Sequence, residues 1–115
     1  MTDIPVPGVP EMSVRLTPHS GAPVGKLYDA ELIFNAGPFV GLKLIGFAVW
    51  ERRGGNGRNV TFPARQYTVN GERRSFALLR PLKDANDSDR VRDYILTAVT
   101  TLEARSDGMA AAAGI

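Results

Sequence analysis

The chain of 115 residues is 43% hydrophobic and has a net charge of +2, which fits one small domain with a single core. It contains no cysteine and one histidine, His19, which excludes thiolate nucleophiles, disulfide bonds, and metal centres made of cysteine or clustered histidine. It has neither an apolar run that could span a bilayer nor a secretion signal, and the sequence therefore predicts a soluble, cytoplasmic protein with no membrane partner.

Both ends of the chain are predicted to be flexible, which leaves residues 13–105 as a single domain. Residues 1–12 contain three prolines and a glycine, which interrupt regular structure. In residues 106–115, Gly108 stands where the last helix is expected to stop, and a short alanine run follows with nothing larger to pack than Met109 and Ile115.

Five strands are predicted in this domain from apolar alternation and from the turn residues between them. They span residues 13–17, 26–35, 42–53, 59–69 and 73–82. The third is apolar on both faces at its start, so we expect it to be central and covered on both sides. Gly54 to Gly57 predict one hairpin turn and Asn70-Gly71 a second. Pro63 has no N–H to donate, which places the fourth strand at an edge or a bulge.

One amphipathic helix follows the strands, with Asn86, Asp87 or Ser88 as its N-cap. Its apolar positions form one stripe, made of Val91, Tyr94, Ile95, Ala98, Val99 and Leu102. The predicted fold class is α+β, an antiparallel five-stranded sheet followed by one C-terminal amphipathic helix. Because one helix covers only one face of a sheet, we expect a second copy to cover the other face in a homodimer.

The most informative feature is the charge between residues 52 and 83. This window contains one acid, Glu72, and eight basic residues: Arg52, Arg53, Arg58, Arg65, Arg73, Arg74, Arg80 and Lys83. Because the window covers two successive hairpins, the charges can converge on one surface of the sheet and attract a polyanion. We therefore predict that these residues bind nucleic acid through its phosphates.

Aromatic residues are interleaved with the arginines at Trp50, Phe62, Tyr67 and Phe76. Trp50 and Phe62 have apolar neighbours and are expected to belong to the core. Tyr67 is the ring expected to be exposed, where it can stack on bases, and it joins the predicted nucleic-acid-binding residues.

The colinear order of these elements resembles the SpoVG-type septation regulators (stage V sporulation protein G). The resemblance covers residues 13–104 and rests on Ser13-Val14-Arg15-Leu16, Leu27 to Phe34, Leu42 to Phe47, Val60 to Arg65 and Phe76 to Leu82. It implies a small dimeric bacterial regulator that binds DNA, and in some members RNA, without catalysis. It also implies that Arg65, in the apolar, proline, small, basic stretch, contacts nucleic acid.

The chain departs from the family pattern in the longer turn at Gly54 to Arg58 and in the alanine tail. The roles of Arg52, Arg53, Arg58, Arg73 and Arg74 rest on charge alone. The family's link to sporulation is not carried over, since nothing in these residues bears on it.

The residues also bear on other classes of function. An enzyme is not predicted, because His19 lies in a Pro/Gly-rich connection and the aspartates around the helix start are explained by capping. The glycines at Gly54 to Gly57 lack the spacing of a phosphate-binding loop. We accordingly expect no catalytic residue, metal, cofactor or small-molecule substrate. The alternatives are a dimeric interaction module whose basic surface binds an acidic protein, and a single-stranded DNA-binding protein like positive cofactor 4.

Overall fold

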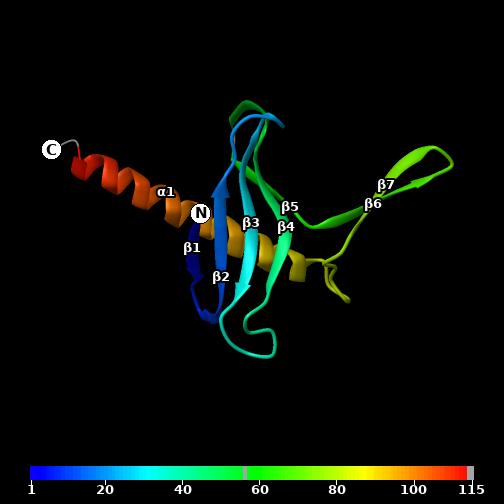
Figure 1. The fold of residues 1–115 in the computed structure, drawn as a ribbon, viewed down its shortest axis with the longest axis horizontal. Helices are drawn as coiled ribbons and strands as arrows, with labels where there is room; N and C mark the ends of the chain where they lie inside the picture. The colour runs from blue at the N-terminus through cyan, green and yellow to red at the C-terminus, as the bar shows by residue number, and fades with distance from the viewer. Residues whose placement is uncertain (56, 114–115) are drawn as a thin grey trace.

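The computed structural model describes residues 1–55 and 57–113, and their side chains up to residue 105. The elements are β1 (Thr2–Val6), β2 (Val9–Pro18), β3 (Lys26–Phe34), β4 (Lys43–Glu51), η1 (Arg53–Gly55), β5 (Arg58–Thr61), β6 (Ala64–Val69), β7 (Glu72–Ala77) and α1 (Asn86–Ala113). Strands β1 to β5 form one antiparallel sheet in chain order, and β6 and β7 form a separate hairpin (Figure 1). The predicted class, a five-stranded antiparallel sheet followed by a C-terminal helix, is confirmed.

The N-terminal segment belongs to the sheet, so the prediction that residues 1–12 are flexible is wrong. Strand β1 pairs with β2, and its side chains Ile4 and Val6 are buried in the core. Pro5 is tolerated because β1 is the edge strand, where a missing N–H costs no bond on the open side. Gly8, with φ of 77°, lies in the tight turn between the two strands.

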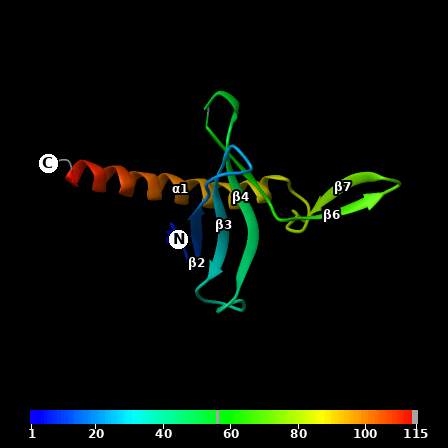
Figure 2. The same ribbon diagram turned by 45° about the horizontal axis from the view of Figure 1, so that its top comes forward.

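Only the start of the predicted fourth strand, as β5, forms the edge of the sheet; the rest of it and the predicted fifth strand form a projecting hairpin. Pairing with β4 ends at Thr61, and the chain leaves the sheet at Phe62 and Pro63. Strands β6 and β7 then extend away from the sheet and α1 in both ribbon views (Figures 1 and 2). We call residues 64–77 the arm. The radius of gyration is 16.0 Å, whereas a compact domain of this length has about 13 Å.

Helix α1 packs its apolar stripe across one face of the sheet, as predicted. Ile95, Ala98 and Val99 are fully buried against side chains of β1 to β5.

The two ends of α1 differ from the prediction. Its N-terminal cap lies earlier than predicted, because the Asp84 carboxylate accepts a hydrogen bond from the backbone N–H of Asn86 at 2.9 Å. The helix also continues past Gly108 to Ala113, whereas the sequence predicted a flexible tail from residue 106. Side chains beyond residue 105 and residues 114–115 lie outside the described part of the chain.

A bulge in β4 explains why its sequence is apolar on both faces. Ala30 of β3 pairs with Phe47, and two residues later Leu32 pairs with Leu44, so β4 contains one residue more than β3 between these pairs. Leu44 and Phe47 therefore both pack against the core, although strict alternation places them on opposite faces. Ile45 remains 59% exposed. The central strand of the sheet is β3, not β4 as predicted.

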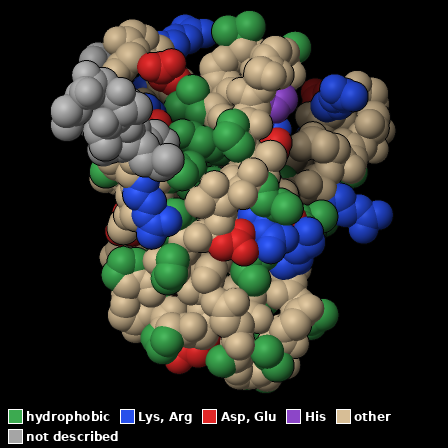
Figure 3. Space-filling model, turned by 60° about the vertical axis from the view of Figure 1, so that its left-hand side comes forward, with side chains coloured by type: hydrophobic (Ala, Val, Ile, Leu, Met, Phe, Trp, Pro, Cys, Tyr) green, Lys and Arg blue, Asp and Glu red, His purple; other side chains and the backbone are tan. Residues whose placement is uncertain are grey.

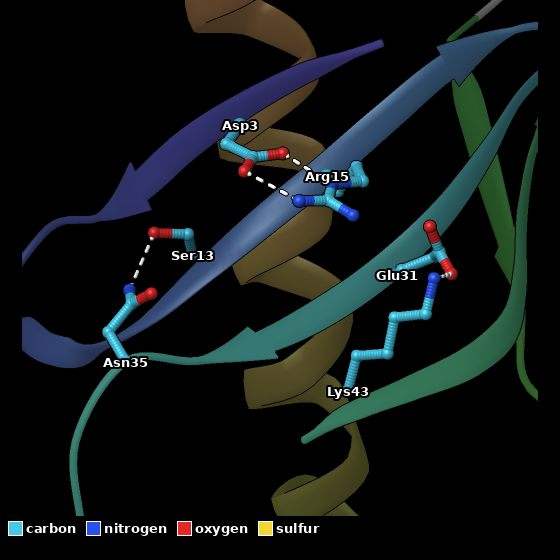
Figure 4. Close-up of polar contacts among 6 residues, drawn as sticks. All are labelled: Asp3, Ser13, Arg15, Glu31, Asn35 and Lys43. Carbon is cyan, nitrogen blue, oxygen red and sulfur yellow. Dashed lines mark hydrogen bonds and ion pairs between the residues drawn. The ribbon is translucent and has the colours of Figure 1, made fainter. Parts of the chain in front are cut away.

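The sheet face opposite α1 carries ion pairs and not the apolar surface that we expected (Figure 4). Arg15 donates to Asp3 across β1 and β2 at 2.7 Å, and Lys43 lies 3.0 Å from Glu31 across β3 and β4. Arg15 and Glu31 are also direct partners in the register. The row of charged side chains from β1 to β4 makes this face polar, so the face does not by itself require a second copy to cover it.

The arm is anchored to the sheet at its base. Pro63 is buried and packs on Gly46, where an added Cβ would lie 2.8 Å from the Cβ of Pro63. Gly46 also has φ of 105°, which other residues rarely adopt. The N–H of Leu78 donates to the Pro63 carbonyl at 2.9 Å and closes the base. The Phe62 ring contacts Phe47 edge to face at 5.3 Å between centroids, so the arm leaves the body from a fixed point.

Candidate nucleic-acid interface

The arm is a two-stranded ribbon that turns at Asn70-Gly71, as predicted. Both turn residues have positive φ, 51° and 80°, which suits the tight hairpin turns that match strand twist. All its residues except Ala77 are exposed, so both faces of the ribbon are open to solvent.

The register assigns every arm side chain to one of two faces. Residues that are direct partners in an antiparallel pair lie on the same face. One face carries Arg65, Tyr67, Val69, Glu72, Arg74 and Phe76, and we call it the aromatic face. The other carries Ala64, Gln66, Thr68, Arg73, Ser75 and Ala77, and we call it the polar face. The three arm arginines are therefore divided between the two faces.

Rings and guanidinium groups alternate on the aromatic face. Arg65 is the partner of Phe76, and Arg74 is the partner of Tyr67. The Tyr67 and Phe76 rings meet edge to face with centroids 5.7 Å apart, and they are 39% and 42% exposed. Arg74 also forms an exposed ion pair with Glu72 at 3.2 Å, which contributes little to stability in solvent. Tyr67 is thus exposed as predicted, and Phe76 lies exposed beside it.

The arm carries the whole net charge of the chain. It contains three arginines and one glutamate, while the remaining eleven basic and eleven acidic residues balance. Charges on a thin projecting ribbon also lie away from the ion pairs of the sheet. The positive field of this protein is therefore concentrated on the arm.

The other predicted basic residues lie elsewhere, so the expected single surface does not form. Arg52 and Arg53 lie at the exposed turn between β4 and β5. Arg80 and Lys83 lie in the connection from β7 to α1, where Arg80 and Pro81 border a shallow groove. In Figure 3, basic side chains on the visible face occur in separate places with acidic ones between them.

Arg58 has a structural role that accounts for its charge. Its Nη1 donates to both carboxylate oxygens of Glu103 on α1, at 3.1 and 3.0 Å. The Tyr28 hydroxyl donates to the same carboxylate at 3.2 Å. Burial, and then the negative charge of Glu103, raise the pKa of Tyr28, which keeps this hydroxyl protonated as a donor. The three side chains join β3, β5 and α1, and we leave Arg58 out of the candidate interface.

The two aromatic residues that were expected in the core, Trp50 and Phe62, differ in their surroundings. Phe62 packs against the core, and the Arg92 guanidinium lies 5.7 Å from its ring centroid. Trp50 is half-buried on the sheet face opposite α1, where its indole N–H donates to the Thr61 hydroxyl at 2.9 Å. Phe62 thus fixes the base of the arm, and the prediction that Trp50 is a core residue is wrong.

The remaining chemistry of the chain is sparse. His19 Nε2 lies 2.8 Å from the Ala22 carbonyl oxygen, so this ring has a hydrogen-bonding partner within its own loop. Within residues 1–55 and 57–105 no three His, Cys, Asp or Glu side chains gather as a metal site. Over the part of the chain that the structure describes, no helix is long and apolar enough to cross a membrane.

Comparison with protein-family models, with curated proteins and with solved structures gives no significant match to this chain. The resemblance to the SpoVG-type regulators therefore rests on the residues alone.

Sequence reasoning missed the contact between the Phe76 and Tyr67 rings. The signal was present, because a two-residue Asn70-Gly71 turn fixes the register and makes Tyr67 the partner of Arg74. Counting outward from the turn places Phe76 on the same face as Tyr67.

Proposed function

We propose that this chain is a nucleic-acid-binding regulatory protein of SpoVG type, which binds DNA or RNA through its arm and acts in the cytoplasm without catalysis. The observation that carries the proposal is the concentration of the whole net positive charge on a projecting ribbon whose two faces are open to solvent. An arm of this kind can reach along a polyanion while the body, whose charges balance, stays clear of it.

Phosphate binding by the arm follows from the chemistry of arginine. A guanidinium group donates two parallel hydrogen bonds to a phosphate and stays charged at every physiological pH. Each phosphate that is neutralised releases condensed counterions from the nucleic acid, which is favourable at low salt and less so at high salt. Arg65, Arg73 and Arg74 point from both faces of the ribbon, so the arm can contact phosphates on either side.

The proposal predicts strongly salt-dependent binding. Fluorescence anisotropy of labelled single-stranded DNA, double-stranded DNA and RNA should give affinities that fall linearly on a log–log plot against salt. The Arg73→Ala variant should show a slope smaller by about 0.7 to 0.9, the value of one lost phosphate contact. If none of the three nucleic acids binds at low salt, the proposal is wrong, and an acidic protein becomes the leading partner for the arm.

We also propose that the protein is a homodimer, on different grounds from those in the sequence. Exposed apolar side chains gather at the start of β4 and in the loop before it, at Phe39, Val40, Leu42 and Ile45. Strand β5 pairs with β4 only from Ala48 onward. On that side of β4, the described residues contain no strand that pairs with residues 43–47. An open edge beside apolar side chains favours association with a second copy. Sedimentation equilibrium should give a dimer for the wild type and a monomer for Ile45→Lys; a monomeric wild type would refute this part.

A further inference from the structure

We infer that the aromatic face of the arm binds single-stranded nucleic acid, with the Tyr67 and Phe76 rings stacking on unpaired bases between phosphates held by Arg65 and Arg74. The inference rests on the proposed function and specifies its ligand. It depends on four side chains from two strands, which the register brings onto one face.

The Tyr67 and Phe76 rings are both exposed on the arm. A two-stranded ribbon has no core of its own, and Tyr67 and Phe76 contact each other but remain 39% and 42% exposed. Exposed rings on a binding surface gain most from a flat apolar partner that covers them. A nucleobase is such a partner, and stacking on it does not depend on the base sequence.

The arrangement of charge around the rings selects among partners. The strand partner of each ring is an arginine, Arg74 for Tyr67 and Arg65 for Phe76. An apolar protein surface that covered the rings would also remove these two cations from water without neutralising them, which is costly. A nucleic-acid strand covers the rings with bases and offers a phosphate to each neighbouring guanidinium.

The state of the bases decides between single and double strands. In a duplex the faces of the bases are already stacked on each other, so rings on a protein surface have no access to them. The polar face of the arm, with Gln66, Thr68, Arg73 and Ser75, could enter a duplex groove without using the rings. Groove binding leaves Tyr67 and Phe76 unexplained, whereas single-strand binding uses both rings and two of the three arm arginines.

The test compares ligands that differ in their bases but not in their phosphates. Fluorescence anisotropy would be measured for a single-stranded oligonucleotide, an abasic strand of the same length, and the corresponding duplex. The proteins are the wild type, Tyr67→Leu, Phe76→Leu and, as a control, Val24→Ala, which truncates an exposed apolar side chain outside both the arm and the proposed dimer contact. Circular dichroism would confirm that each variant is folded.

We expect the wild type to bind the base-containing single strand about tenfold or more tightly than the abasic strand or the duplex. Tyr67→Leu and Phe76→Leu should each lose about tenfold for the base-containing strand only, and Val24→Ala should equal the wild type. Three results would overturn the inference and leave the proposed function intact. They are equal affinity for the abasic and the base-containing strand, a preference for the duplex, and ring variants that bind like the wild type. No binding to any of the three ligands would overturn both.

Discussion

Replacing Arg65 and Arg74 together by glutamate is expected to lower the affinity for single-stranded nucleic acid by about 100-fold or more at moderate salt. The two residues are partners of the exposed rings on one face of the arm, so the variant places two negative charges where we expect phosphates to lie. Like charges at a phosphate site repel the ligand and abolish counterion release. The log–log salt slope should fall by about 1.4 for a single strand, which corresponds to two lost contacts.

The chain offers a matched control for this variant. Arg52 and Arg53 lie together on the exposed turn between β4 and β5, and their replacement by glutamate changes the net charge by the same amount. If long-range attraction alone determined binding, the two double variants would lose the same affinity. Our account predicts a large loss for the arm variant and a small one for the turn variant. Equal losses, or a larger loss for the turn variant, would move the interface away from the arm.

Replacing Phe47 by alanine is expected to lower the free energy of unfolding by about 3 to 5 kcal/mol. Phe47 is among the largest fully buried side chains, and its ring contacts Phe62 at the base of the arm. The substitution removes apolar contacts, leaves a cavity between sheet and helix, and deprives Phe62 of its ring partner. Since domains of this size have only about 5 to 15 kcal/mol of stability in total, the variant should be close to unfolding.

Urea unfolding followed by circular dichroism measures this loss, with Val24→Ala as the control. Val24 is 95% exposed in the loop between β2 and β3, so its truncation should change the free energy of unfolding by less than about 1 kcal/mol. A loss below about 1 kcal/mol for Phe47→Ala would contradict the fold, because it would mean that Phe47 is not buried between the sheet and α1 in solution.

The sequence predicts the elements better than their assembly. The apolar stripe of α1 and the Asn70-Gly71 turn follow from local chemistry, namely helical periodicity and a need for positive φ, and the structure confirms both. The pairing of β1 does not follow from local chemistry. Pro5 argues against a strand, yet edge pairing tolerates it and burial of Ile4 and Val6 stabilises the strand.

Two non-local events explain the other differences. The extra residue in the β4 bulge reverses the alternation after Leu44, and only its pairing with β3 reveals it. The division of one predicted strand into β5 and β6 depends on Pro63 and its contact with Gly46, which are seventeen positions apart. Sequence reasoning recognised Pro63 as an edge or bulge residue but could not show that the chain leaves the sheet there.

The candidate site was predictable in composition and not in geometry. Counting charges found the basic window, and Arg65, Tyr67, Arg73 and Arg74 do lie together on the arm. The count could not separate them from Arg58, whose partner Glu103 is 45 positions away on α1. Long-range ion pairs of this kind are invisible to a local charge window.

The most direct test of the account is to map the contact on the protein itself. Backbone amide resonances of the ¹⁵N-labelled protein would be followed by NMR while a single-stranded oligonucleotide is added. We predict that the shifts concentrate in β6 and β7, residues 64–77, and at the base of the arm around Leu78 and Leu79, with the sheet and α1 unchanged. Shifts confined to the turn at Arg52 and Arg53, or to α1 and the sheet, would contradict the claim that the arm binds nucleic acid.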